Sequence, residues 1–64
     1  MDFLKIDDKR RAKRLTVLQL CEKIGVNEST YYKWKENPGR MKADTFIKIV
    51  DALDMSDQEK INLF

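Results

Sequence analysis

The sequence predicts an all-α fold, a compact bundle of five short helices that forms one domain over residues 1–64. The chain has only two glycines and one proline and few clustered β-branched residues, a composition that favours helix. Apolar residues recur at intervals of three and four, and capping or turn residues separate the periodic segments. A chain of 64 residues builds one small core, so we expect a stability of only a few kcal/mol.

The first helix is expected over residues 3–13, where Phe3 and Ile6 lie on one stripe. Acidic residues come early in this segment, and the basic run "KRRAKR", residues 9–14, comes late. This order suits the helix dipole, because carboxylates then lie near its positive end and cations near its negative end.

The second helix is expected to begin after Thr16, a residue type that caps helix N-termini well. Leu20, Cys21 and Ile24 form its inward stripe. Gly25 follows at the position where a helix commonly ends in the left-handed conformation, which glycine adopts at little cost.

The third helix is expected to begin at Asn27, again an N-cap residue type. Tyr31 and Trp34 are three residues apart and share one face, and Val26 can staple that face to the core. The turn residues "NPG" at 37–39 end the helix.

The last two helices are expected over residues 43–53 and from Ser56 onward. The fourth helix has the clearest amphipathic spacing of the chain, at i, i+3, i+4 and i+7, in Phe46, Ile49, Val50 and Leu53. Ser56 and Glu59 match the capping-box pattern of a fifth helix. We expect Ile61 and Phe64 to fold back on the core.

The short break at residues 25–27 predicts a helix-turn-helix over about residues 16–36. A single long helix through this region would spread its apolar residues around the axis. The break instead lets Leu20 and Ile24 meet Tyr31 and Trp34.

An outward face follows from this arrangement. With Tyr31 and Trp34 turned inward, the residues left facing outward are Glu28, Ser29, Tyr32 and Lys33. A carboxylate, a hydroxyl, a phenol and an ammonium are groups that read base edges or phosphates in a DNA major groove. The same four residues also fit an ordinary solvated surface, and Glu28 also fits the preference for acids at a helix N-terminus.

Charge is distributed unevenly along the chain. Residues 1–42 hold eleven Lys and Arg against six Asp and Glu, a balance of +5, whereas residues 43–64 hold two against five, a balance of −3. This polarity suits a molecule that orients itself on a polyanion.

Several classes of function are disfavoured. The chain has no histidine and a single cysteine, Cys21, so we expect no disulfide, no metal site and no cofactor. Neither a serine–base pair nor a phosphate-binding loop is recognisable, so we expect no enzyme and no catalytic residue. No apolar run approaches 18 residues, and we expect a cytoplasmic protein that is not associated with a membrane.

The stretch "LTVLQLCEKIGVNESTYYKWKENPGRMKADTFIKIVDAL" resembles the helix-turn-helix family of phage repressors and Cro proteins, over about residues 6–57. The resemblance implies a lambda-repressor-like domain that places its third helix in the major groove of operator DNA, usually as a homodimer. It implies a sequence-specific transcriptional regulator of a phage or mobile element, with Glu28, Ser29, Tyr32 and Lys33 reading bases. The residues implied to contact phosphates are Arg10, Arg14, Thr16, Lys35, Arg40 and Lys42.

The chain departs from this family at the start of the second helix. Val17 stands where the family usually has a polar residue that touches a phosphate, and Leu18 lies beside it. This feature motivates an alternative, a protein-interaction module of the antirepressor or antitoxin kind that binds its partner through these two residues. Lys42 is also a poor capping residue for the fourth helix. Ile61, Leu63 and Phe64 are candidates for a dimer surface.

Overall fold

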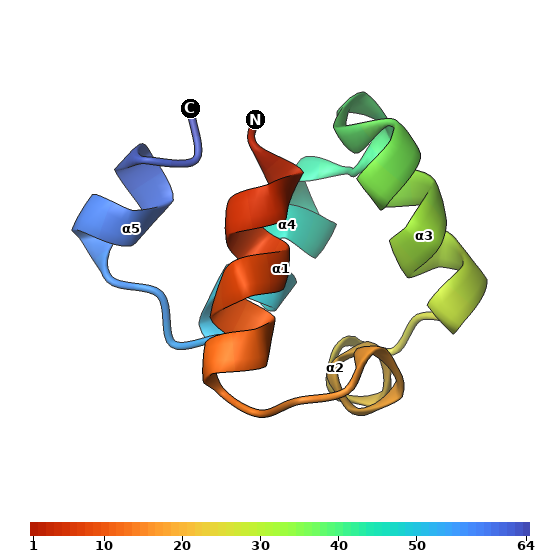
Figure 1. Ribbon diagram of the computed structural model, residues 1–64. Coiled ribbons are helices and arrows are strands. Elements are labelled where there is room, and N and C mark those ends of the chain that lie inside the picture. The colour runs from red at the N-terminus through yellow and green to blue at the C-terminus, as the bar shows by residue number, and fades with distance from the viewer.

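The computed structural model describes all 64 residues and is entirely helical, with no β-strand (Figure 1). The predicted fold class, a compact five-helix bundle, is confirmed. The elements are α1 (Phe3–Ala12), α2 (Val17–Ile24), α3 (Glu28–Glu36), the 3₁₀ turn η1 (Pro38–Arg40), α4 (Ala43–Ala52) and α5 (Asp57–Ile61).

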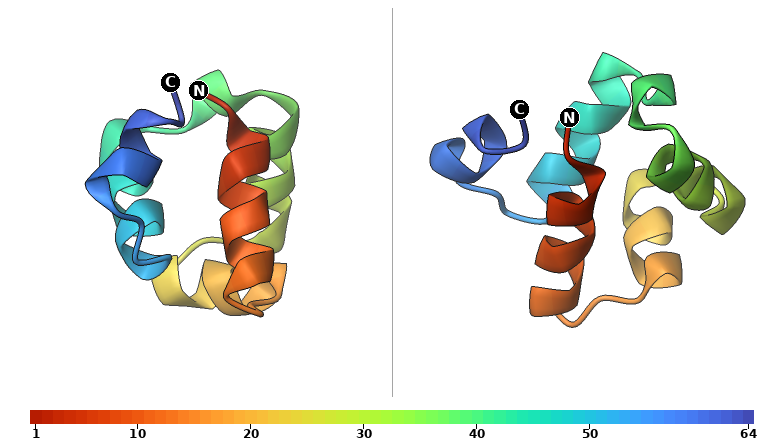
Figure 2. Two further views of the ribbon diagram at one scale, coloured as in Figure 1. Left: turned by 60° about the vertical axis from the view of Figure 1, so that its left-hand side comes forward. Right: turned by 45° about the horizontal axis from the view of Figure 1, so that its top comes forward.

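The helices surround one core. α2 packs against both α3 and α4, and α1 packs against α3. α3 and α5 lie on opposite sides of α1 in every view, and the two chain termini lie next to each other (Figures 1 and 2). The termini are joined by a hydrogen bond of 2.7 Å from the backbone N–H of Asp2 to the carbonyl of Leu63.

The predicted inward stripes are confirmed. The core contains twelve buried apolar residues from every helix except α5 and from the segments that flank α5: Phe3, Ile6, Leu20, Cys21, Ile24, Tyr31, Trp34, Ile49, Val50, Leu53, Met55 and Leu63. The ring of Phe3 meets the ring of Tyr31 edge-on, with centroids 5.1 Å apart. Offset and edge-on aromatic pairs are favoured because the positive edge of one ring meets the negative face of the other.

The helix ends follow the capping residues of the sequence. Thr16 and Ser56 each form a complete capping box, with Gln19 and Glu59 respectively. Gly25 ends α2 in the left-handed conformation, with φ of 75°. Asn27 occupies the N-cap position of α3 but makes no side-chain capping bond.

The expectation for the C-terminal segment is wrong. Ile61 and Phe64 do not fold back on the core, since they are 66% and 85% exposed. Met55 and Leu63 fill the core instead. α5 ends at Ile61, and the turn that follows presents Leu63 to the interior, where its carbonyl also accepts the hydrogen bond from Asp2.

Polar contacts fasten α5 and the following turn to α1. The ammonium of Lys5 donates to the carbonyl of Asn62 at 2.7 Å, and Lys9 pairs with Glu59 at 2.8 Å. The hydrogen bond from Lys9, followed by that from the backbone of Ser56, lowers the pKa of Glu59 to about 2.

Candidate nucleic-acid interface

The turn between α2 and α3 sets the direction of α3. Gly25 takes the left-handed conformation, and the N–H of Val26 donates to the carbonyl of Cys21 at 3.0 Å, which closes the end of α2. Val26 packs against the core and anchors the turn. α3 then runs along the edge of the molecule (Figure 2). Its nine residues make a rod about 14 Å long.

The two faces of α3 differ as predicted. Tyr31 is fully buried and Trp34 is 5% exposed, whereas Tyr32 is 49% exposed and Lys33 is exposed. Glu28 and Ser29 are exposed at the start of the helix. The structure therefore places all four predicted base-reading residues on the surface of one helix. Tyr32 is held partly in place, because its ring meets that of Tyr31 edge-on at 5.9 Å.

A buried polar cluster joins α3 to α1. The hydroxyl of Tyr31 donates to Oδ1 of Asp7 at 2.5 Å, and the Asp7 side chain is only 3% exposed. Arg10 and Arg11 pair with the same carboxylate at 3.2 Å and 2.9 Å. Arg10 also donates to the carbonyl of Leu15 at 2.6 Å. Every buried side-chain polar atom of the chain has a partner, as a stable buried network requires.

The cluster changes the titration of its members. Burial alone would raise the pKa of Asp7, but hydrogen bonds from Tyr31 and Arg10 and the charges of Arg10 and Arg11 outweigh it, so this pKa is lowered. Burial, and then the hydrogen bond to Asp7, raise the pKa of Tyr31 well above its ordinary value. The phenol stays protonated and the carboxylate stays charged at neutral pH, the pair of states that the hydrogen bond needs.

The predicted phosphate ligands fall into two groups. Four of them are exposed and make no ion pair within the chain: Arg14, Lys35, Arg40 and Lys42. The predicted base-reading residue Lys33 is likewise exposed and without an ion pair. The five ion pairs instead use cations of α1, of the residue after it and of α5. An unpaired exposed cation is the kind of group that exchanges condensed counterions for phosphates.

Arg10 belongs to the second group. Its side chain is 13% exposed, and its guanidinium is already bonded to Asp7 and to the carbonyl of Leu15. Releasing it toward a phosphate would leave the Asp7 carboxylate buried with less compensation, which is costly. The structure gives Arg10 a role in holding α1 against α3, which the sequence reasoning did not assign to it.

Thr16 keeps a donor free. Its Oγ1 accepts from the N–H of Gln19 at 3.0 Å, and its own N–H donates to the side chain of Gln19 at 2.8 Å. The hydroxyl hydrogen makes no bond within the chain. Because a hydroxyl both accepts and donates, capping leaves Thr16 able to donate to an external oxygen.

A polar hollow at the end of α3 contains residues that the sequence reasoning missed. It is lined by Lys33, Glu36, Asn37 and Arg40, with no apolar residue. Glu36 and Asn37 lie beside Lys33 because they follow it by three and four residues at the end of α3, and η1 then brings Arg40 to the same hollow. The "NPG" run indicated a turn but not that this turn would be helical and would bring Arg40 near Lys33.

The apolar pair at the start of α2 is divided by the fold. Val17 is half-buried and packs against the core, whereas Leu18 is 49% exposed. A single exposed leucine is ordinary for a soluble domain and is not a docking patch. This arrangement does not favour the protein-interaction alternative. None of the helices has the length and apolar character needed to cross a membrane.

Two short helices packed together and joined by a three-residue turn, with the outer face of the second helix exposed, are the arrangement of a helix-turn-helix domain. A scan against protein families agrees: residues 6–60 match the helix-turn-helix family, of the Cro/C1 repressor type, and the chain belongs to this family. Searches among curated proteins and among solved structures find no match.

Proposed function

We propose that this helix-turn-helix regulator recognises a specific operator by placing α3 in the major groove of double-stranded DNA. The observation that carries the proposal is the division of α3, in which Tyr31 and Trp34 are buried while Tyr32 and Lys33 face solvent. The core thereby holds the helix rigidly while its other face stays free for the bases. The resemblance to phage Cro proteins extends the proposal to a promoter of a phage or mobile element.

Each exposed side chain of α3 has a chemical role in this proposal. Lys33 donates to O6 and N7 of guanine, and Glu28 accepts from N4 of cytosine. Tyr32 packs its ring on a thymine methyl or donates to a phosphate, and Ser29 bonds to either kind of base edge. The ring contact between Tyr32 and Tyr31 restricts its motion, so less conformational entropy is lost on binding.

The proposed contacts to the DNA phosphates come from residues at both ends of the helix-turn-helix. The proposed phosphate ligands are Arg14, Thr16, Lys35, Arg40 and Lys42, since each is exposed with a donor available. Arg10 is omitted because its guanidinium is bonded internally. These contacts position the domain on the duplex, and α3 then selects the sequence.

The proposal includes a homodimer on the operator. A single helix of nine residues reads only a few base pairs, so one copy binds weakly and with low selectivity. Two copies on a two-fold site, with half-sites about 34 Å apart, present the same helix to successive major grooves on one side of the duplex.

Selection of bound duplexes from a random pool, followed by binding measured against salt, tests the proposal. We expect a recurrent two-fold sequence and a log–log slope of affinity against salt of several units, about 0.9 for each neutralised phosphate. Equal affinity for random and selected duplexes, or a slope near zero, would falsify the proposed function.

A further inference from the structure

A stripe of three lysines runs along α1. Lys5, Lys9 and the C-cap residue Lys13 follow one another at intervals of four, so they lie on one side of the helix over about 12 Å. In the sequence, such a stripe looks the same as a surface that binds phosphates. None of the three lysines has a contact in the DNA-binding arrangement proposed above.

Oxygen atoms of residues 54–64, which we name the covering segment, meet every lysine of the stripe. The three contacts are Lys5 to the backbone carbonyl of Asn62 at 2.7 Å, Lys9 to the carboxylate of Glu59 at 2.8 Å and Lys13 to the carboxylate of Asp54 at 3.4 Å. α5, at the centre of this segment, lies beside α1 on the side away from α3 (Figures 1 and 2). The covering segment therefore offers acceptor atoms along the stripe, as a row of phosphates would.

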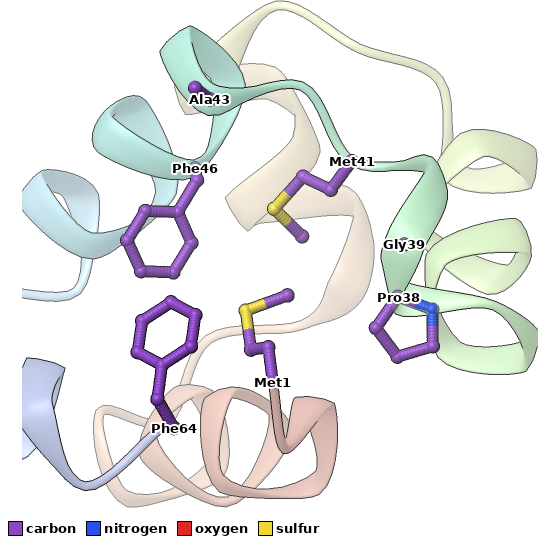
Figure 3. Close-up of a pocket in the computed structure, with 7 residues that line it drawn as sticks. All are labelled: Met1, Pro38, Gly39, Met41, Ala43, Phe46 and Phe64. Atoms are coloured by element: carbon purple, nitrogen blue, oxygen red, sulfur yellow. The ribbon is translucent and has the colours of Figure 1, made fainter.

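Apolar contacts and a backbone bond hold the covering segment in place independently of its charges. Met55 and Leu63 are buried near its two ends, and the N–H of Asp2 donates to the carbonyl of Leu63 at 2.7 Å. The rings of Phe64 and Phe46 face each other, with centroids 5.8 Å apart (Figure 3). Removal of one carboxylate from the segment should therefore free a lysine without releasing the segment from α1.

The covering segment gives a role to the uneven charge of the chain. It holds three acidic residues and one lysine, a balance of −2, and it lies on a stripe that carries +3. Lys35, Arg40 and Lys42, beside α3, have no such cover and make no ion pair. The free cations are thus concentrated near α3, and the opposite side of α1 is largely neutralised, so the field of the protein turns α3 toward a polyanion.

We propose that the covering segment is an intramolecular competitor for phosphate, with Glu59 and Asp54 as specificity-determining residues that do not touch DNA; this inference rests on the proposed function. A lysine paired with a carboxylate adds no net charge to the surface, so it does not release counterions from a duplex. Non-specific binding depends almost entirely on that release, whereas specific binding also uses base contacts. The cover therefore lowers affinity for random duplexes more than affinity for the operator.

The position of the stripe explains why a cover improves selectivity. α3 and α5 lie on opposite sides of α1, so a duplex read by α3 does not reach the stripe (Figures 1 and 2). An uncovered stripe would instead hold DNA with α3 turned away from the bases. Such binding is blind to sequence, and the covering segment suppresses it.

Glu59→Gln, with Asp51→Asn as the matched control, tests this role on a random duplex. Glutamine keeps the capping box of α5 and frees Lys9. Asp51 is exposed and makes no ion pair, so its replacement changes the net charge equally and frees no lysine. In Glu59→Gln we expect several-fold tighter binding at low salt and a log–log salt slope steeper by about 0.9, the value for one more neutralised phosphate. Asp51→Asn should keep the slope of wild type, and neither variant should change affinity for the selected operator.

Lys9→Gln completes the test, because it separates a freed lysine from a general change of charge. Alone it should leave the slope of wild type unchanged, since Lys9 is already paired, and combined with Glu59→Gln it should restore that slope. The inference is overturned by equal slopes in wild type and Glu59→Gln, by a steeper slope that persists in the double variant, or by a shallower slope in Lys9→Gln alone. If wild type prefers no selected duplex, the proposed function fails, and the comparison of Glu59→Gln with Asp51→Asn still decides whether the segment covers Lys9.

Discussion

The hydroxyl of Tyr31 should account for a large share of the stability of this domain. It donates to Asp7 at 2.5 Å, and the Asp7 side chain is 3% exposed. Tyr31→Phe removes this one hydrogen bond without changing the shape of the core. The carboxylate keeps its ion pairs with Arg10 and Arg11, so the charge stays partly compensated.

The size of the effect follows from the bond that is lost. A hydrogen bond to a charged group contributes about 1.5–3 kcal/mol, and a carboxylate buried with an unfilled acceptor position adds to the loss. We expect Tyr31→Phe to lower the free energy of unfolding by about 2 kcal/mol. A domain of this size has only a few kcal/mol in total, so the change is a substantial fraction.

Urea unfolding followed by fluorescence measures this change, because Trp34 is the only tryptophan and is 5% exposed. With a denaturant slope of about 1 kcal/mol/M, the midpoint should fall by about 2 M. Tyr32→Phe is the matched control, since its hydroxyl makes no bond within the chain and its side chain is half exposed. Its free energy of unfolding should change by less than about 0.5 kcal/mol.

The effect of Tyr31→Phe should depend on pH. The pKa of Asp7 is lowered in the folded protein, so the stabilisation linked to its charge is complete above its ordinary pKa of 3.8 and is lost as the pH falls through the lowered value. Tyr31 is one cause of the lowering, so the difference between wild type and Tyr31→Phe should shrink in acid. An equal loss of stability in Tyr31→Phe and Tyr32→Phe, or a loss that stays constant at every acidic pH at which the protein is folded, would refute this reasoning.

Three further outcomes are expected. Glu59→Gln keeps the capping box but removes the charge. The folded pKa of Glu59 is about 2, so wild type loses stability as the pH falls toward that value and Glu59→Gln should lose less. Urea titration in low salt measures the difference. Gly25→Ala should lower the free energy of unfolding by about 1 kcal/mol in the same assay. The φ angle is 75° and an added Cβ meets no atom within 4 Å, so the loss comes from backbone strain alone. An unchanged free energy of unfolding would contradict this explanation. Lys33→Ala should weaken operator binding by about 1–3 kcal/mol and relax selection at one base pair. The control Lys60→Ala, in α5 on the far side of the molecule, should change neither. If Lys33→Ala leaves the selected sequence unaltered, the proposed base contact of Lys33 is wrong.

The helices and the exposed face of α3 were predictable because they depend on local rules. Periodic spacing determined which face of α4 is buried, and the capping residues Thr16 and Ser56 marked the starts of α2 and α5. The burial of Tyr31 and the exposure of Tyr32 followed from spacing alone, because adjacent residues on a helix lie about 100° apart and cannot both face one core.

Two features were beyond the sequence patterns. A basic residue in a charged run looks the same whether it faces phosphates or a carboxylate. Arg10 is bonded to its near neighbours Asp7 and Leu15, and Asp7 is buried because α1 packs on α3 and Tyr31. The inward residue at the C-terminus is Leu63 rather than Ile61 or Phe64, because α5 ends after five residues and the chain turns toward α1. The inward turn of Leu63 has no periodic signature in the sequence.

The amino-acid sequence by itself therefore determined the helices, their inward stripes and the surface of α3 that faces solvent, since each of these follows from the geometry of a single helix and its caps. Only the tertiary structure decided which cations remain unpaired, which tyrosine hydroxyl meets a buried carboxylate and where Phe64 meets Phe46. Those features arise when segments far apart in the chain are brought within a few ångströms, and hydrogen bonds and desolvation act only at that range.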